Sequence, residues 1–179
     1  MSHCTRLLYS AMDFSVTAAG LLEFGGRRVA CAFGRSGITH AKIEGDGATP
    51  AGCFAIRRVM FRPDRIDPPD TAMPVAPIRQ RDGWCDDPRD PAYNRPVSLP
   101  YPASTEALWR DDGAYDIVVV LGHNDDPPVP GSGSAIFVHV ARANGAPTEG
   151  CVAMALPDLL AMLGACSPGD RLCVNPDLP

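Results

Sequence analysis

The sequence predicts a mainly β domain with one clear helix and an irregular, proline-rich excursion. Three observations support this fold class. Short β-prone runs separated by glycine turns fill much of the chain. One leucine stripe at helical spacing lies near the C-terminus. Ten of the 19 prolines fall between residues 62 and 102, where they limit regular structure.

The first half of the chain is predicted to consist of short strands. Residues 14–17, 21–24 and 27–33 are β-prone, and Gly25-Gly26 separates the last two as a hairpin turn would. Five glycines between residues 34 and 52 then punctuate a long connection. Residues 54–61 resume the strand pattern.

Residues 62–102 are predicted to be an insertion into the domain. A connection of this length in a compact domain is usually functional or disordered. This one carries Trp84, Tyr93 and Tyr101, which favour an ordered excursion packed against the domain. We expect it to form a wall of a substrate cleft.

The second half contains the strongest strand prediction, at residues 115–121, and another strand at 135–140. A helix is predicted from Pro157, a residue that suits a first helical turn, to a C-terminal cap at Gly164. Its apolar stripe consists of Leu156, Leu159, Leu160 and Leu163. A last short strand is expected at residues 171–174.

Length and charge limit the class of protein. The 179 residues suit one domain, 1–179. A net charge of -5 without a basic run argues against nucleic acid as the main partner. No apolar stretch approaches the roughly 18 residues of a membrane span. The N-terminus has no charged region followed by a long apolar one, so no signal peptide is visible.

Seven cysteines make an odd count, so at least one has no partner within the chain. No pair has the C-x-x-C spacing of a zinc ribbon or a thioredoxin motif. Cys31, Cys53 and Cys173 lie in apolar strand-like runs, and we interpret them as small buried hydrophobic residues. The sequence allows disulfides without requiring one.

The most informative pair is His139 and Cys151, twelve residues apart. A β-branched run leads to the histidine, and a glycine-rich loop leads to the cysteine. A thiol nucleophile needs a base within hydrogen-bond reach and backbone N–H groups around the sulfur. Gly150 allows the backbone to approach closely and to turn its N–H groups toward the sulfur. The alternative interpretation is a buried cysteine in a turn beside a buried histidine in a strand.

His123 is a weaker candidate. It follows a strong strand and can line the cleft, but a solvated turn histidine fits the sequence equally well. A zinc site of His123, His139 and Cys151 has suitable ligand types but matches no familiar spacing. The acidic residues form no catalytic pair, so a glycosidase has little support.

These residues resemble the catalytic domain of L,D-transpeptidases, the YkuD-like family. The family ends in a His-containing strand, a Ser/Thr-x-Gly-Cys turn, a helix and a closing strand. Here His139, residues 148–151, the predicted helix and the last strand follow in that order. The family's earlier Thr-Pro-x-Gly-x-Phe motif corresponds to residues 49–54, with Lys42 upstream. The resemblance covers roughly residues 14–175.

The resemblance implies a β-sandwich that performs Cys–His acyl transfer on peptidoglycan stem peptides. Cys151 would attack the carbonyl of the diamino acid at position three and expel the terminal D-alanine. An amine of another stem or water would then take the acyl group, giving a 3→3 crosslink or carboxypeptidase activity. His139 would act as base and then acid, and N–H groups of Gly150 and Cys151 would form the oxyanion hole. No metal or organic cofactor is implied, and the expected location is the cell envelope or periplasm.

Two departures from the family bear on the substrate. Glu149 stands where the family usually has histidine, and Ala153 where it has an arginine suited to a carboxylate. Arg142 can replace that arginine in space, or it can be an ordinary loop arginine. Thr148, Glu149, Arg142 and His123 are therefore the expected substrate contacts. The alternatives are a Cys–His amidase or peptidase on another peptide, and a wall-binding module without turnover.

Overall fold

The computed structural model describes residues 13–178, which contain fourteen strands and one helix. The elements in chain order are β1 (Asp13–Thr17), β2 (Leu21–Phe24), β3 (Arg27–Ala32), β4 (Ile38–Thr39), β5 (Thr49–Pro50), β6 (Gly52–Phe61), β7 (Val75–Pro77), β8 (Asp82–Cys85), β9 (Pro96–Ser98), β10 (Thr105–Ala107), β11 (Ile117–Leu121), β12 (Phe137–Val140), β13 (Val152–Met154), α1 (Leu156–Ala165) and β14 (Arg171–Asn175).

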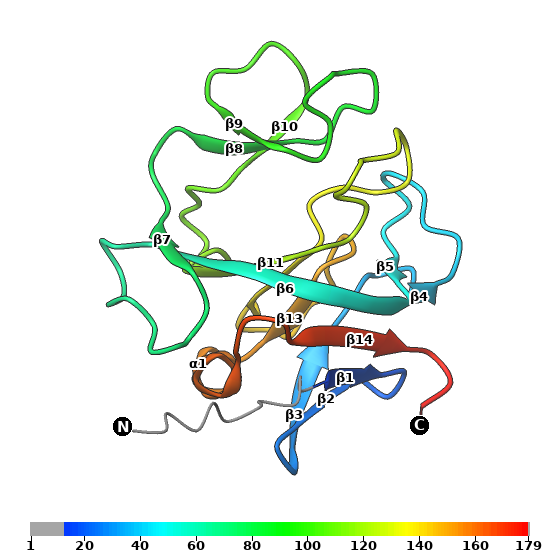
Figure 1. The fold of residues 1–179 in the computed structure, drawn as a ribbon, viewed down its shortest axis with the longest axis vertical. Helices are drawn as coiled ribbons and strands as arrows, with labels where there is room; N and C mark the ends of the chain where they lie inside the picture. Colours follow the sequence, from blue (N-terminus) through cyan, green and yellow to red (C-terminus); the bar gives the residue numbers. More distant parts are fainter. Residues whose placement is uncertain (1–12, 179) are drawn as a thin grey trace, which may run out of the picture.

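Eight strands form one closed sheet in the order β11-β12-β13-β3-β2-β1-β14-β6, because β6 also pairs with β11 (Figure 1). The sheet is mixed: β1–β14 and β12–β13 are parallel pairs, whereas β6 is antiparallel to both β11 and β14. β7 extends β6 as a short parallel strand. The predicted mainly β fold with one helix is confirmed. The layers expected of a β-sandwich are parts of one sheet here, because the sheet closes on itself.

The strand β11 is apolar throughout because both of its faces are buried. Ile117, Val119 and Leu121 belong to the main core, together with side chains of α1. Val118 and Val120 belong to a second core on the opposite face, which the excursion covers. The continuous apolar run that made this strand easy to predict is therefore the signature of a strand between two cores.

The helix α1 confirms the prediction from Pro157, with differences in its end and its buried face. It continues through Gly164 to Ala165, and its C-terminal cap is Cys166, so the predicted glycine cap is wrong. Leu160 is 41% exposed, whereas Met162 is fully buried beside Leu159 and Leu163. The buried face of the helix is therefore rotated away from the predicted leucine stripe. Met162 occupies a core position on this face, which methionine fills as well as leucine does.

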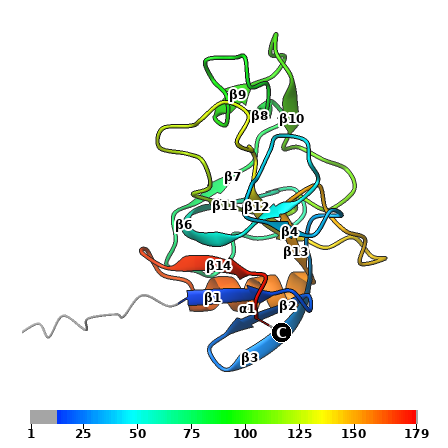
Figure 2. The same cartoon turned by 90° about the vertical axis from the view of Figure 1, so that its right-hand side faces the viewer.

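The predicted hairpin at Gly25-Gly26 is present, and both glycines have positive φ angles, of 51° and 77°. Two-residue hairpins favour this geometry because it matches the twist of the flanking strands. Figure 2 shows this hairpin, β2–β3, beside β1 and at the opposite end of the molecule from β8–β10.

Cys53 and Cys173 are joined by a disulfide, which corrects their interpretation as buried hydrophobic residues. They lie directly opposite each other on the antiparallel strands β6 and β14. In β14 the inward positions are Leu172 and Val174, so Cys173 faces outward between them. A short apolar run cannot reveal which alternate residues face the core. Cys31 is partly buried and packs against the main core.

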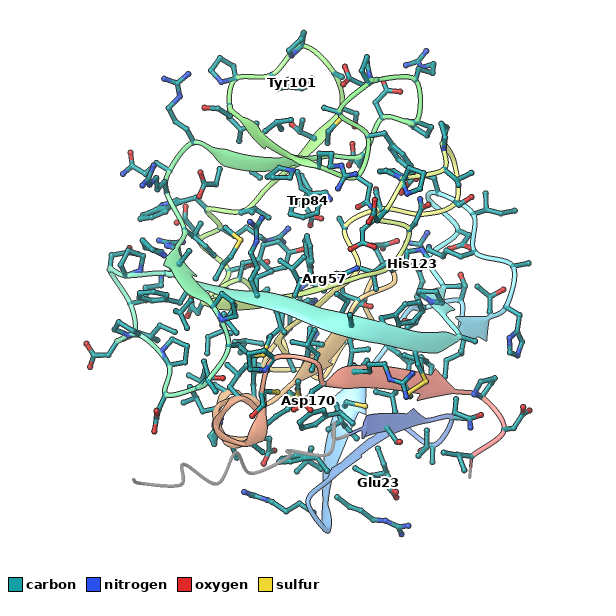
Figure 3. The ribbon with its side chains drawn as sticks, in the orientation of Figure 1. Glu23, Arg57, Trp84, Tyr101, His123 and Asp170 are labelled. Carbon is teal, nitrogen blue, oxygen red and sulfur yellow. A yellow bond between two sulfur atoms is a disulfide. The ribbon has the colours of Figure 1, made fainter. Side chains whose placement is uncertain are left out.

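The excursion at residues 62–102 is ordered and carries β7, β8 and β9. With β10 it forms a three-stranded antiparallel sheet in the order β10-β8-β9, drawn above the closed sheet in Figure 1. Trp84 points from this small sheet toward the closed sheet (Figure 3) and meets Phe137 edge-on, with ring centroids 5.2 Å apart. Among the described residues, no helix is long and apolar enough to cross a bilayer.

Candidate active site

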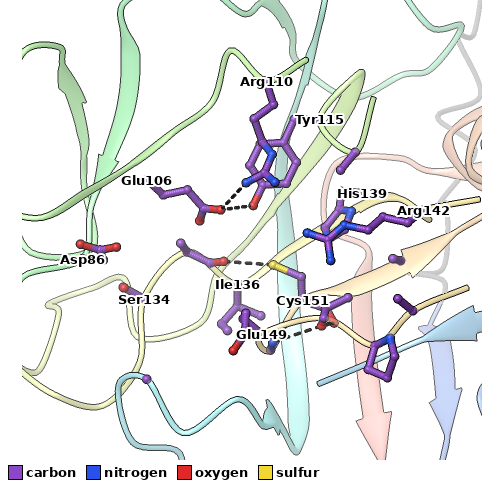
Figure 4. A pocket seen from close by; sticks show the side chains of 18 of the residues that line it. Asp86, Glu106, Arg110, Tyr115, Ser134, Ile136, His139, Arg142, Glu149 and Cys151 are labelled. Atoms are coloured by element: carbon purple, nitrogen blue, oxygen red, sulfur yellow. Dashed lines mark hydrogen bonds and ion pairs between the residues drawn. The ribbon is translucent and has the colours of Figure 1, made fainter. Parts of the chain in front are cut away.

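The parallel pairing of β12 and β13 brings His139 and Cys151 to one face of the sheet. His139 lies opposite Ala153, and Cys151 immediately precedes β13. Because alternate residues of a strand share a face, His139, Phe137, Cys151 and Ala153 all point toward the excursion. His139 and Cys151 line one cavity of about 400 Å³ (Figure 4).

The turn before Cys151 is held by the hydroxyl group of Thr148. This group donates to the carbonyl oxygen of Cys151 over 2.5 Å and accepts from the N–H of Gly150 over 3.1 Å. Gly150 has a φ of +139°, and a Cβ at this position would lie 2.9 Å from the carbonyl oxygen of Ala48. The turn therefore requires glycine here. The N–H of Gly150 is already bonded, which corrects the expectation that it points at an oxyanion.

The Cys151 thiol is buried and hydrogen-bonded to backbone groups. Its sulfur lies 3.2 Å from the carbonyl oxygen of Ala135, to which the thiol donates, and the N–H of Phe137 donates to it over 3.4 Å. Burial and the charge of Glu106 raise its pKa to about 12, although Phe137, Lys42 and Arg110 act in the opposite direction. At neutral pH the resting group is therefore a thiol rather than a thiolate.

His139 is oriented to act as a neutral base. Its Nδ1 lies 2.9 Å from the carbonyl oxygen of Val140. Since a carbonyl only accepts, Nδ1 carries the proton and Nε2 keeps its lone pair. Burial lowers the pKa of His139, and Arg110 and Arg142 lower it further against the effect of the Val140 carbonyl. The ring meets Tyr115 edge-on at 5.3 Å between centroids.

Charged side chains of both signs line the cavity around these two residues. Arg110 lies over the ring of Tyr115 at 4.9 Å, pairs with Asp112 at 2.6 Å and lies 3.6 Å from Glu106. The hydroxyl group of Tyr115 donates to Glu106 over 2.5 Å. Burial raises the pKa of the Glu106 carboxyl, although these two neighbours oppose the shift. The other charged lining residues are Lys42, Glu44, Asp86, Arg142 and Glu149.

The family model of the L,D-transpeptidase catalytic domain, YkuD, matches residues 16–174. The chain belongs to this family. Two solved structures are similar to it over 92% of its length at 14% identity. They are an L,D-transpeptidase from Mycobacterium smegmatis, with a TM-score of 0.41, and L,D-transpeptidase 1 from Mycobacterium tuberculosis, with a TM-score of 0.38. The chain spans 58% and 61% of those two chains. No curated protein matches it.

The expected substrate contacts of this L,D-transpeptidase family member have different environments. Arg142 lines the cavity with a side chain that is 51% exposed, and its Nε lies 4.0 Å from Asp112. Glu149, at the position of the family histidine, also lines the cavity, but its carboxylate pairs with Arg35 in a solvent-exposed ion pair. Thr148 lines the cavity too, although its hydroxyl group is engaged within the turn.

His123 is not among the residues that line the cavity, which corrects its assignment to the cleft. Its Nε2 lies 2.9 Å from the carbonyl oxygen of Ser132, and its ring packs edge-on against Phe54 at 5.3 Å. The His123 imidazole, labelled in Figure 3, is therefore engaged by a residue of the connection that follows it and by Phe54. Within residues 13–178, no three His, Cys, Asp or Glu side chains are arranged to hold a metal ion.

The sequence did not indicate Asp86, Glu106, Arg110 and Tyr115 as residues that line this cavity. Asp86 comes from the irregular excursion, Glu106 from the short strand β10, and Arg110 and Tyr115 from the connection between β10 and β11. Hydrophobic periodicity carries little information in such short or irregular segments. The one available signal was the composition of residues 105–115, where three acidic residues, one arginine and two aromatic residues lead into the strongest strand.

Proposed function

We propose that this chain is a cysteine acyltransferase of the L,D-transpeptidase type that acts on peptidoglycan stem peptides. The observation that carries the proposal is the position of His139 and Cys151 on one face of adjacent parallel strands, in one cavity. The family membership of residues 16–174 supports the same chemistry.

The acylation step begins with movement of the thiol proton. The Cys151 side chain turns away from the carbonyl oxygen of Ala135 and passes its proton to Nε2 of His139. The sulfur then attacks the carbonyl carbon of the diamino acid at position three of the stem. The N–H of Cys151 stabilises the oxyanion, since the N–H of Gly150 is bonded to Thr148. His139 returns the proton to the amine of the leaving D-alanine, and a thioester remains.

The second step transfers the acyl group from the thioester. His139 takes a proton from the attacking group, which is the amine of a second stem or a water molecule. The first acceptor gives a crosslink and the second gives a shortened stem. The proton then returns to the Cys151 sulfur, so His139 acts first as a base and then as an acid in each half of the reaction.

The high pKa of Cys151 makes this base necessary. With a pKa of about 12, only about one molecule in 10⁵ would carry a free thiolate at pH 7. A neutral His139 that accepts the proton as the sulfur attacks means that no free thiolate has to form beforehand. The depressed pKa of His139 keeps Nε2 unprotonated at neutral pH, as the role requires.

Arg142 is our candidate for the arginine that the family carries at the position of Ala153. It lines the cavity, and its interaction with Asp112 at 4.0 Å is weak enough to exchange for a substrate carboxylate. Ala153 itself is 1% exposed and lies directly opposite His139. The terminal carboxylate of the stem would then lie on the His139 side of the cavity.

The disulfide supports action in the cell envelope. Disulfides persist in oxidising compartments and are rare where thiols are kept reduced. The Cys53–Cys173 bond links the strands β6 and β14 of the closed sheet, so the fold itself incorporates it. We infer that the protein acts outside the cytoplasm, where its proposed substrate lies.

The proposal is tested by mass spectrometry of the protein after incubation with an acid-terminated tetrapeptide stem or with a carbapenem. A single acyl adduct on Cys151 is expected, and Cys151→Ser should abolish thioester formation. Cys31→Ser is the matched control, because Cys31 is another free cysteine whose pKa burial raises to about 12. An adduct on Cys31 or Cys85 would refute the assignment, and peptide binding without any adduct would favour a wall-binding module.

A further inference from the structure

One end of the cavity beside Cys151 is acidic. Asp86, Glu106 and Glu44 all line it. Glu106 lies on β10 directly opposite Trp84 of β8, and Asp86 follows β8. Glu44 lies on the connection between β4 and β5. Figure 4 shows Asp86 and Ser134 on the side of the cavity away from His139, with the carboxylate of Glu106 between them and the thiol.

The cations near these carboxylates have closer partners of their own. Lys42 is bonded to Asp46. Arg110 lies 2.6 Å from Asp112 but 3.6 Å from Glu106. The remaining contacts of the acidic end are neutral: Tyr115 donates to Glu106, and Tyr93 donates to Glu44. The negative charge of this end is therefore only partly balanced by the protein.

Two buried polar atoms at this end have no hydrogen-bond partner within the described residues. They are Oδ1 of Asp86 and Oγ of Ser134. Ser134 is only 7% exposed. The Tyr93 hydroxyl is near enough for Ser134 to influence its pKa, but the two groups are not in hydrogen-bond geometry. A buried carboxylate oxygen without a donor is costly, so this arrangement fits a site completed by a ligand that brings donors.

We propose that the acidic end binds a primary ammonium group, namely the side-chain amine of the diamino acid in a stem peptide. The inference rests on the proposed function. An ammonium carries three donors and one positive charge. These match the oxygen atoms of Glu106, Asp86 and Ser134, and the charge offsets the unbalanced carboxylates. The excursion, β10 and the connection between β11 and β12 together thus supply a specificity-determining site next to a nucleophile that precedes β13.

Binding of the ammonium also has a consequence for the nucleophile. The charge of Glu106 raises the pKa of Cys151, and this effect is second only to burial. A cation held against Glu106 screens that charge and favours the thiolate. The amine that identifies the substrate would therefore assist the thiol that attacks it.

The test uses Cys151→Ala protein, which cannot turn the substrate over, so binding alone is measured. The two probes are tetrapeptide stems with lysine at position three, one with a free side-chain amine and one with that amine acetylated. We expect acetylation to weaken binding by about tenfold to a hundredfold, as for loss of a charge-assisted hydrogen bond. Isothermal titration calorimetry gives both dissociation constants.

Glu106→Gln and Asp86→Asn, each in the Cys151→Ala background, assign the preference to the acidic end. Each should weaken binding of the free-amine peptide by about tenfold and leave the acetylated peptide within about twofold. Glutamine still accepts from Tyr115, and thermal unfolding checks that both variants fold. Asp126→Asn is the control, because it removes the same charge from an exposed residue outside the cavity. It should change neither constant.

Three results would overturn the inference: equal binding of the two peptides, no binding of the free-amine peptide, or an Asp126→Asn effect as large as those of the two cavity variants. The proposed function is judged separately, by acylation of Cys151 in the unsubstituted protein. If acetylation of the peptide, Glu106→Gln and Asp86→Asn all leave the rate of Cys151 acylation unchanged, the ammonium site is refuted and the proposed function stands. Slower thioester formation in the variants is the expected result for a site that binds the donor stem, and an effect on transfer alone would contradict it, because an attacking amine must be deprotonated.

Discussion

The side-chain oxygen of Asn94 accepts a hydrogen bond of 3.1 Å from the N–H of Ala135. Ala135 is the residue whose carbonyl oxygen receives the Cys151 thiol. The same Asn94 oxygen accepts from the indole of Trp84, and its amide group donates to the carbonyl oxygens of His123 and Asn124. One residue of the excursion therefore joins the small sheet to the segment that holds the Cys151 thiol.

Asn94→Ala should destabilise the protein and lower its activity. It leaves the buried indole N–H of Trp84 and the N–H of Ala135 without their acceptor, at about 1–3 kcal/mol for each unsatisfied group. Chemical denaturation followed by tryptophan fluorescence measures the free energy of unfolding. Asn175→Ala is the control, because the bond that its side chain accepts is a local one, from the N–H of Asp177. Equal stability of the two variants would contradict the role given to Asn94.

His139→Ala should lower kcat/KM by a factor of about 10² to 10⁴, the usual loss when a general base is removed. Steady-state assays with a tetrapeptide stem measure the effect, and circular dichroism checks the fold. His123→Ala serves as the comparison, because His123 lies outside the cavity and bonds Ser132. Loss of turnover in the His123 variant and not in the His139 variant would mean that the base has been misassigned.

In the pH profile of kcat/KM, the fall in activity on the acidic side should have its midpoint below pH 6.5. The base must be unprotonated, and burial lowers the pKa of His139 from its ordinary value of 6.5. Activity should therefore persist through pH 6.5 and fall only as pH drops through the folded-state pKa. The same shift means that the unfolded state binds more protons below pH 6.5, so the free energy of unfolding should also decrease there. NMR titration of the His139 imidazole gives its pKa for comparison with the pH profile of kcat/KM. A midpoint above pH 6.5 on the acidic side of that profile would contradict the assignment of His139 as the base.

Arg142→Ala should weaken binding of an acid-terminated stem by about tenfold to a hundredfold, since a charge-assisted contact is worth about 1.5–3 kcal/mol. An amide-terminated stem should lose much less. Arg89→Ala is the control, because Arg89 is 90% exposed and pairs with Asp87 in the excursion. Ala153→Arg should not restore binding, because position 153 faces His139 and a long side chain there would fill the cavity. Equal losses for both stems would show that another group reads the carboxylate.

Reduction of the Cys53–Cys173 disulfide should lower stability. The bond joins residues 120 positions apart, and closing a loop of about this length is worth up to about 5 kcal/mol in the chain-entropy account. Cys173→Ser should lower Tm and make it insensitive to reductant, whereas Cys31→Ser should keep the sensitivity. Thiol labelling of the denatured, unreduced protein checks the bond directly, and labelling of every cysteine would contradict it.

Much of the fold could be predicted because local patterns encode it. The Gly25-Gly26 hairpin, the strand at Ile117–Leu121 and the helix after Pro157 depend on turn chemistry, burial of both strand faces and helical spacing, all of which are local. Boundaries and faces were less accurate. The helix ends at Ala165 rather than at a cap on Gly164. The outward direction of Cys53 and Cys173 depends on strand neighbours distant in sequence.

For the site, the sequence by itself determined the motif that carries Cys151 and the order of segments shared with the family. Only the tertiary structure decided that the carbonyl oxygen of Ala48 leaves no room for a side chain at Gly150, that His123 lies outside the cavity, and that Asp86 and Glu106 line it. The physical reason is that a turn is set by its own residues and bonds. The lining of a cavity is set by how an irregular segment packs against a distant strand, and no periodicity records that packing.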